Sequence, residues 1–168
     1  MNKKKNIALI GMPGSGKSTL GKILSRKIDM EIIDVDTYIE KEEKKTISEI
    51  FEMGEEYFRD IESKYVNKIS DCEGTVICTG GGVIKKEINI KNLKKNSTIV
   101  FIDRPLEYII SDVEIDSRPL LKDNKEKIYK LFQERYELYK KYCDIHILNN
   151  KDMYMAVEAI IKKLDEIE

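Results

Sequence analysis

Residues 11–19, GMPGSGKST, contain the residue types that bind phosphate. They match the pattern G-x-x-x-x-G-K-[ST], in which glycines let backbone N–H groups surround an anion and the lysine adds a positive charge. We therefore expect Lys17 to contact the outer phosphates of a nucleoside triphosphate, and the Ser18 hydroxyl to join a Mg²⁺ shell. The alternative is a glycine-rich turn that carries the Lys-Ser pair by chance. The pattern alone does not distinguish a kinase from a hydrolase or a nucleotide switch.

Two carboxylates, Asp34 and Asp36, follow a short apolar run. In a strand, side chains two residues apart lie on one side, so we expect both carboxylates to face the same crevice. One could hold a water of the Mg²⁺ shell, and the other could accept hydrogen bonds from substrate hydroxyls or take a proton. The alternative is structural, with Asp36 as the N-cap of a helix over residues 37–43.

Three glycines, Gly80, Gly81 and Gly82, follow the apolar run of residues 75–78. Such a run could be a hinge or a bulge. However, it is predicted to lie at the same sheet edge as the phosphate-binding segment, where glycine lets backbone N–H groups approach a ligand. We therefore favour close approach of a ligand over the two structural alternatives.

Arginines are few among many lysines, so each can be considered separately. Arg59 is followed three residues later by Glu62, which could hold its guanidinium group in place. Arg118 lies in SRPLL and Arg135 in ERYELY. The others are expected to be exposed or structural: Arg26 and Arg104.

Residues 111–123 are the best candidate for a mobile lid. Phosphoryl transfer to a hydroxyl must exclude water, and a mobile segment that bears a cation both excludes water and supplies charge. Arg118 would be that cation.

Short apolar runs alternate with helix-period segments along the chain. Strands are predicted over residues 6–10, 31–35, 75–78, 98–102 and 145–148. Helices are predicted over residues 17–28, 37–43, 55–70, 126–142 and 153–164, and Thr46 with Glu49 fits a capping box at the start of another. Apolar strands that alternate with helices indicate a buried parallel sheet. We predict a three-layer α/β domain, with a central five-stranded parallel sheet, helices on both faces and ligands at the carboxyl ends of the strands.

The composition fits a soluble globular protein with a single domain, residues 1–168. Hydrophobic residues make up 41% and charged residues 36%, and the net charge of −1 comes from two signs that are well mixed. This pattern offers no basic face for nucleic acid and no apolar stretch long enough to span a membrane. The 3 cysteines are odd in number and lack C-x-x-C spacing, which argues against disulfides or zinc and for a cytoplasmic location.

Together these segments resemble the shikimate kinase family, small enzymes of the P-loop, nucleoside-monophosphate-kinase-like type. The matching pieces, in family order over residues 7–164, are GMPGSGKST, IDVDTYIE, GEEYFRDIE, TGGGV, SRPLL and ERYELY. The first piece is generic, whereas its combination with the others is much more specific. The resemblance implies a P-loop kinase fold with a mobile lid. It also implies ATP-dependent phosphorylation of the 3-hydroxyl of shikimate to shikimate 3-phosphate, a step of aromatic amino acid (chorismate) biosynthesis.

For the nucleotide, the resemblance implies that ATP is bound by six consecutive residues and by the lid arginine: Gly14, Ser15, Gly16, Lys17, Ser18, Thr19 and Arg118. Mg²⁺ would be held by Ser18 and, through water, by Asp34. Lys17 and Arg118 would neutralise the transferring phosphoryl group from opposite sides. These two residues and Asp36 are the implied catalytic groups.

For the substrate, the resemblance implies that Asp36 binds ring hydroxyls and could take the proton of the attacking one. Arg59 and Arg135 would clamp the carboxylate, because their planar forks suit its geometry better than lysine does. Gly81 would donate its backbone N–H group. The substrate-binding helices would span residues 36–70, and the family suggests a monomer.

Two other functions remain open from the residues. A kinase of the same fold that acts on gluconate or a nucleotide could also use Arg59 and Arg135, although F-R-x-x-E together with T-G-G-G argues against it. A non-catalytic module that binds ligand without turnover is favoured only by the acidic lid residues Asp112, Glu114 and Asp116. The intact phosphate-binding and carboxylate residues count against that module.

Overall fold

The computed structural model describes residues 5–116, 122–150 and 152–167. Within them, five strands form one parallel sheet in the order β2-β3-β1-β4-β5. The strands are β1 (Asn6–Ile10), β2 (Glu31–Asp34), β3 (Thr75–Cys78), β4 (Ser97–Asp103) and β5 (Ile145–Leu148). The predicted five-stranded parallel sheet is therefore confirmed, and β1 lies at its centre.

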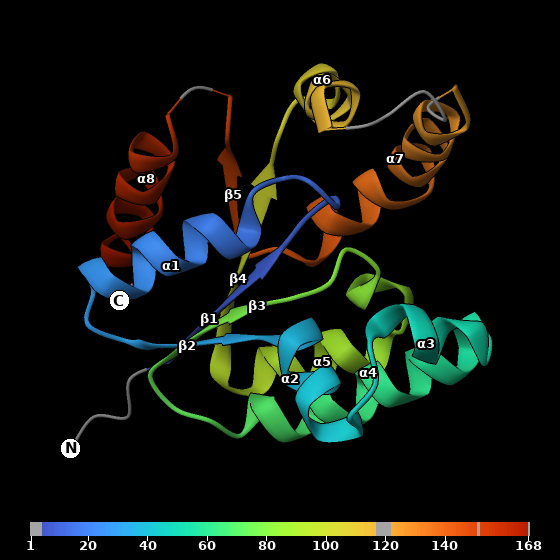
Figure 1. Ribbon diagram of the computed structural model, residues 1–168. Helices are drawn as coiled ribbons and strands as arrows, with labels where there is room; N and C mark the ends of the chain where they lie inside the picture. The colour runs from blue at the N-terminus through green and yellow to red at the C-terminus, as the bar shows by residue number, and fades with distance from the viewer. Residues whose placement is uncertain (1–4, 117–121, 151, 168) are drawn as a thin grey trace.

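Helices cover both faces of this sheet, as predicted. They are α1 (Lys17–Lys27), α2 (Val35–Glu43), α3 (Ile47–Glu52), α4 (Glu55–Ser70), η1 (Val83–Lys85), α5 (Glu87–Asn96), α6 (Leu106–Asp116), α7 (Lys122–Tyr142) and α8 (Met153–Asp165). Figure 1 shows α1 and α8 together on one side of the sheet, and α4 and α5 on the other. Successive residues of β1 serve both layers, because Leu9 packs with the α1 and α8 side chains whereas Ala8 and Ile10 pack with those of α4 and α5.

The strand order creates a crevice between the carboxyl ends of β1 and β3. The chain leaves β1 through α1 on one face, and leaves β3 through η1 and α5 on the other face. Such a reversal is where ligands bind in open parallel sheets. Thr79, just past β3, donates its backbone N–H and its Oγ1 hydroxyl to the Leu9 carbonyl, at 3.2 and 2.8 Å. These bonds hold the two strand ends together at the base of the crevice.

Two helix starts test the predicted caps. The capping box is confirmed, since the Glu49 N–H donates to Thr46 Oγ1 at 3.2 Å and the Thr46 N–H donates to Glu49 Oε2 at 2.7 Å. The predicted cap at Asp36 is wrong, because β2 ends one residue earlier than expected and α2 begins two residues earlier. Asp34 is the N-cap, and its Oδ1 accepts from the Thr37 N–H at 3.2 Å. A carboxylate at the N-cap satisfies a free helix N–H, which fixes where the strand turns into a helix.

Two helices were not predicted. Residues 111–116, expected to belong to a mobile lid, form the end of α6, which packs against the sheet through Ile109. Acidic residues at 112, 114 and 116 interrupt the apolar spacing of this helix, which is why it was not predicted. In α5 the apolar face is short, and Asn89 is buried there with its amide donating to the Val83 carbonyl at 3.0 Å. Arg118 lies outside the described residues.

Candidate active site

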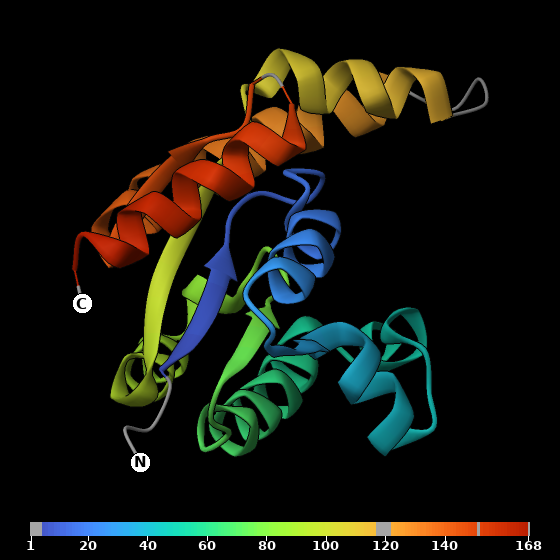
Figure 2. The ribbon, with the colours of Figure 1, turned by 90° about the vertical axis from the view of Figure 1, so that its left-hand side faces the viewer.

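The phosphate-binding loop, residues 11–16, connects β1 to α1. Gly14 and Gly16 have φ angles of 78° and 92°, a region that side chains other than glycine rarely adopt. The first turn of α1 has no side-chain cap, so its N–H groups and the positive end of the helix dipole are directed at the loop. Figure 2 shows this loop at the carboxyl end of β1, between α1 and the pair α6 and α7. The arrangement is one that binds anions.

Lys17 is the cation of this loop. Its side chain is 8% exposed, and Nζ donates to the carbonyls of Gly11 and Met12 at 2.9 and 2.8 Å. Burial lowers the pKa of Lys17 to about 8, although Cys78, Asp36 and Asp34 oppose the change. A buried lysine that loses hydration energy in this way gains strongly from an anion placed beside it.

A hollow of about 390 Å³ lies in front of the loop. Its walls are the loop with the start of α1, the two carboxylates after β2 and the segment after β3. The lining residues are Pro13, Gly14, Gly16, Lys17, Ser18, Thr19, Asp34, Asp36, Thr79, Gly80 and Gly81. The predicted phosphate, carboxylate and glycine segments therefore share one cavity.

Ser18 and Asp34 meet at one wall of this hollow. The Ser18 hydroxyl donates to Asp34 Oδ2 at 2.6 Å. Both groups are hard oxygen donors, of the kind that Mg²⁺ prefers, and no cluster of three acidic, histidine or cysteine ligands occurs among the described residues. Mg²⁺ bound beside phosphates typically uses only one or two protein ligands, so this pair fits the ion.

Asp36 reaches the same hollow by a different geometry from the predicted one. It lies in the first turn of α2, not in β2, so strand alternation does not explain why it faces Asp34. Its Oδ1 is buried without a hydrogen-bond partner in the described structure. Burial raises the pKa of Asp36, and the charge of Asp34 raises it further against the opposing charges of Lys17 and Arg59. A buried carboxylate oxygen without a protein partner is suited to bind a ligand or to accept a proton.

The three glycines after β3 each face a different group of the chain. A β-carbon on Gly80 would lie 3.1 Å from Asp36 Oδ1, and one on Gly81 would lie 2.6 Å from Pro13 Cδ. On Gly82 it would overlap the guanidinium group of Arg59. None of the three has a positive φ angle, so close packing rather than backbone conformation explains the glycines. Neither a hinge nor a bulge is therefore needed to explain why glycine occupies these three positions.

Arg59 is buried rather than exposed at the helix surface, with 5% exposure. Its Nη1 donates to Glu62 Oε2 at 2.7 Å, which confirms that Glu62 holds the guanidinium group. The guanidinium also lies over the ring of Phe58, 4.9 Å from the centroid. Burial raises the pKa of Glu62, while the charge of Arg59 opposes that change. The Oε1 atom of Glu62 has no partner in the described structure and lies beside Gly80.

Arg135 is the second buried arginine of the site, with 7% exposure. It lies on α7, and its Nε has no hydrogen-bond partner in the part of the chain that the structure describes. Tyr139, one turn later, donates its hydroxyl to the Gly81 carbonyl at 2.5 Å. The charge of Arg135 acts on Lys17, Glu62 and Tyr139, which places it at the centre of the same cluster.

Comparisons with known proteins agree with this geometry. The chain matches the family model described as shikimate kinase over residues 13–165. A shikimate kinase of Clostridium botulinum (strain Alaska E43 / Type E3) is 50% identical over 159 residues, which cover 95% of this chain and 96% of the relative. The chain belongs to the shikimate kinase family.

Solved structures of shikimate kinases have the same fold. The enzyme from Acinetobacter baumannii in complex with shikimate superposes with a TM-score of 0.86 at 32% identity, covering 98% of this chain and 93% of that one. The enzyme from Bacteroides thetaiotaomicron gives a TM-score of 0.86 at 27% identity, covering 96% and 98%. The predicted family is confirmed. Shikimate kinases are enzymes, so the comparisons favour a kinase over the non-catalytic module and over kinases for gluconate or nucleotides.

Among the residues implied by the shikimate kinase resemblance, most lie in or beside the hollow. Ser15 is the exception within the loop, because it is buried and its carbonyl accepts from Asn149 Nδ2 at 2.9 Å on the far side. Arg59 and Arg135 lie beyond the glycine segment, buried near Gly82 and Tyr139. The implied lid arginine lies outside the described residues, so the structure does not place it.

Several residues of the shikimate kinase site were missed as contributors. Arg104, expected to be structural, donates from Nη1 to the Gly14 carbonyl at 3.1 Å and to Asp112 Oδ2 at 2.5 Å. Asp112 therefore pairs with an arginine. Tyr139 was noted only as part of a helix face. A polar hydroxyl within an apolar helical stripe, next to a motif arginine, was the available signal.

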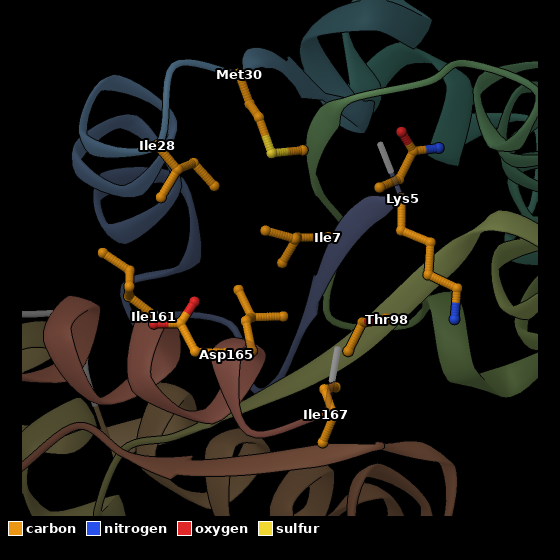
Figure 3. A pocket seen from close by; sticks show the side chains of 10 residues that line it. Lys5, Ile7, Ile28, Met30, Thr98, Ile161, Asp165 and Ile167 are labelled. Carbon is orange, nitrogen blue, oxygen red and sulfur yellow. The ribbon is translucent and has the colours of Figure 1, made fainter. Parts of the chain in front are cut away.

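A second hollow, of about 190 Å³, lies at the opposite end of the sheet. Figure 3 shows its wall residues, among them Ile7 of β1, Ile28 and Met30 between α1 and β2, and Ile161 of α8. No residue implied for the shikimate kinase reaction lines it, so it does not compete with the first hollow as the catalytic site.

Proposed function

We propose that this chain transfers the γ-phosphoryl group of ATP to the 3-hydroxyl of shikimate, giving shikimate 3-phosphate and ADP. Membership of the shikimate kinase family supports the reaction. The observation that carries the site assignment is that three of the buried polar atoms without partners in the described structure lie around the glycine segment after β3: Asp36 Oδ1, Glu62 Oε1 and Arg135 Nε. Buried polar groups normally have partners, and a polyhydroxylated carboxylate would supply them.

Shikimate carries a carboxylate, which suits two arginines. Arg59 and Arg135 are both nearly buried, and each can present a planar fork to a carboxylate. Glu62 fixes Arg59 from behind, so the fork is oriented before the substrate arrives. Preorganised donors of this kind bind without the entropy cost of ordering a free side chain.

The hydroxyl end of shikimate would lie toward the phosphate-binding loop. Asp36 would accept a hydrogen bond from the attacking hydroxyl, and the Gly81 N–H would donate to the substrate. The raised pKa of Asp36 makes it a stronger base than an ordinary aspartate, which suits the removal of the proton as the new O–P bond forms. Asp36 would hold this proton until it passes to solvent as the products are released.

The phosphates of ATP would lie against Gly14, Gly16, Lys17, Ser18 and Thr19, with Ser15 supporting the loop from behind. Lys17 would neutralise charge on the transferred group, and Arg118 would do so from the other side as part of a lid over residues 111–123. Ser18 and Asp34 would hold Mg²⁺, which would supply positive charge to offset that of the phosphates. These assignments rest on the loop geometry and on the family pattern.

We also propose a monomeric, cytoplasmic enzyme of chorismate biosynthesis with no nucleic-acid or membrane partner. The mixed charge of the chain supports the absence of nucleic acid. No helix in the described ranges has the length and apolar character required to cross a membrane. We propose in addition that residues 1–168 form a single domain.

An ADP-release assay tests this function directly. With ATP and Mg²⁺, the protein should release ADP with shikimate and not with gluconate or nucleoside monophosphates. Arg59→Ala should abolish shikimate binding and leave ATP binding nearly unchanged, whereas the exposed Arg26→Ala control should change neither. ADP release with none of the acceptors would overturn the enzymatic assignment, and equal loss of both ligands in Arg59→Ala would overturn the role of that arginine.

A further inference from the structure

The far side of α7 carries a polar cluster that the reaction does not use. Tyr136 donates its hydroxyl to Asp103 Oδ2 at 2.8 Å, and His146 Nε2 lies 2.8 Å from the same oxygen. Asp103 is the last residue of β4 and is 8% exposed, while His146 lies on β5 with its side chain 43% exposed. A carboxylate oxygen shared by a tyrosine and a histidine links one helix to two strands.

Aromatic packing fixes the same cluster. The Phe101 ring stacks with His146 at 4.9 Å between centroids and with Tyr139 at 5.2 Å, both at interplanar angles of 23°. Tyr136 meets Phe101 edge-on at 5.8 Å and stacks on Phe132 at 4.6 Å. Burial and the bond to Asp103 raise the pKa of Tyr136 to about 12, so its hydroxyl remains a hydrogen-bond donor well into the alkaline range.

One turn of α7 therefore has two hydroxyl contacts with the sheet. Tyr139 binds the Gly81 carbonyl after β3, and Tyr136 binds Asp103 at the end of β4. These two strands flank β1, so the contacts lie on either side of the phosphate-binding loop. Arg135 directly precedes Tyr136 on the same turn, and its Nε has no partner within the described structure. Two fixed points on one turn determine both the rotation and the position of that turn.

Asp103 also contacts the nucleotide side of the crevice. Its carbonyl accepts from the Asn149 N–H at 2.7 Å, and Asn149 Nδ2 donates to the Ser15 carbonyl of the phosphate-binding loop at 2.9 Å. The carboxylate of Asp103 thus orients α7 from the same residue whose backbone supports the loop. A carboxylate clamp depends on its placement, since a shift of about 1 Å can cost a large part of an oriented interaction.

We propose that Tyr136, Asp103 and His146 are positioning residues, which hold the turn of α7 so that Arg135 is presented to the substrate carboxylate. His146 keeps the Asp103 carboxylate turned toward α7 by donating to Oδ2 from Nε2. This inference rests on the proposed role of Arg135 in binding shikimate. It adds three residues to the site that do not touch the substrate.

Equilibrium binding of shikimate and of ATP, measured separately by calorimetry, tests the inference on the intact chain. Tyr136→Phe keeps both aromatic contacts and removes only the hydroxyl. We expect it to raise the Kd for shikimate about 5- to 10-fold, the effect of one lost hydrogen bond. The Kd for ATP should stay within about twofold. Tyr129→Phe is the matched control, because Tyr129 is exposed on the same helix, and it should change neither Kd.

A second pair of variants distinguishes positioning from general stability. His146→Leu should weaken shikimate binding, and His146→Gln, whose amide can still donate to Asp103, should restore it. Equal effects of leucine and glutamine would overturn the role of the His146 hydrogen bond. Loss of ATP and shikimate affinity in parallel would show that the cluster only stabilises the fold, which would also overturn the proposal.

Arg135→Ala separates this inference from the function on which it rests. Adding Tyr136→Phe to Arg135→Ala should cause no further loss of shikimate affinity, because the hydroxyl acts through Arg135. An unchanged Kd in Arg135→Ala alone would overturn the role of Arg135 in the proposed function. If Arg135→Ala raises the Kd for shikimate but Tyr136→Phe does not, the positioning role of Tyr136 is overturned while the role of Arg135 stands.

Discussion

The guanidinium group of Arg59 lies directly against the α-carbon of Gly82, where a β-carbon would overlap it. The φ angle of Gly82 is −97°, a value that any residue adopts, so the glycine is needed for space and not for conformation. Arg59 is thereby held between the glycine segment, Glu62 and the Phe58 ring. The glycine run therefore shapes the substrate half of the site through the arginine behind it.

Gly82→Ala should consequently displace Arg59 and weaken shikimate binding. We expect the KM for shikimate to rise at least about 10-fold, since a misplaced charged fork loses more than one neutral hydrogen bond. The KM for ATP should change less than about twofold, because Gly82 does not line the phosphate-binding hollow. Initial-rate kinetics with each substrate varied in turn measures both values.

Gly74→Ala is the control for simple destabilisation. Gly74 has a φ angle of 62° in the turn before β3, so alanine there is strained by about 1 kcal/mol. This variant should lose thermal stability with unchanged KM values. If Gly82→Ala behaves like Gly74→Ala, the contact with Arg59 has no role in substrate binding.

The strands could be predicted because they are short runs rich in apolar residues, as expected for a mostly buried parallel sheet. Residues 6–10, 75–78 and 145–148 were predicted with the observed bounds. The end of β2 could not be predicted from the same pattern, because Val35 is apolar in either a strand or a helix. The hydrogen bond from the Thr37 N–H to Asp34 sets the boundary between β2 and α2. That bond depends on the backbone conformation at Asp34, which the apolar pattern does not predict.

The burial of Arg59 could not be predicted from its own segment. A helical arginine with a carboxylate three residues later is typical of an exposed ion pair. Arg59 is buried because Gly82, 23 residues later, has no side chain and leaves space for the guanidinium group. The sequence of residues 55–62 gives no indication of that space. The contact of Arg104 with the Gly14 carbonyl was missed for the same reason, since it joins β4 to the phosphate-binding loop.

Asp36 should lower the stability of the ligand-free protein at neutral pH. Because burial raises its pKa, the folded chain holds this proton more tightly than the unfolded chain does. Its contribution to stability therefore falls as the pH rises from the unfolded pKa, about 4, through the higher folded pKa. Asp36→Asn removes the buried charge. We expect its Tm at pH 7 to exceed that of the unmodified protein by roughly 2–4 °C, the shift that corresponds to 1 kcal/mol in a chain of this size, while activity is lost.

Thermal unfolding followed by circular dichroism at pH 7 and at pH 4 measures this effect. The difference in Tm should shrink at pH 4, because near the unfolded pKa much of the free-energy cost that the raised folded pKa imposes at pH 7 is lost. Asp71→Asn, at the exposed end of α4, should show no such pH-dependent gain. A lower Tm for Asp36→Asn at pH 7 would mean that the Asp36 carboxylate stabilises the empty site.

Lys17 should take up a proton when ATP binds at alkaline pH. Its pKa of about 8 in the ligand-free protein leaves it partly neutral at pH 8.5, and adjacent phosphates favour the charged form. We expect an uptake of about half to one proton per ATP at pH 8.5, measured by calorimetry in buffers with different ionisation heats. Lys17→Arg is the control, because arginine remains charged at this pH. Equal uptake in both proteins would assign the proton to another group.

Arg104 should support nucleotide binding through the loop carbonyl that it holds. Its Nη1 donates to the Gly14 carbonyl at 3.1 Å, and Asp112 orients the guanidinium group at 2.5 Å. Arg104→Ala should raise the KM for ATP about 3- to 10-fold, the effect of one charge-assisted hydrogen bond beside the phosphates, and leave the KM for shikimate unchanged. Arg26→Ala, exposed at the far end of α1, is the charge-matched control. If the two variants have the same KM for ATP, Arg104 contributes only to the fold, because loss of its positive charge alone is then without effect.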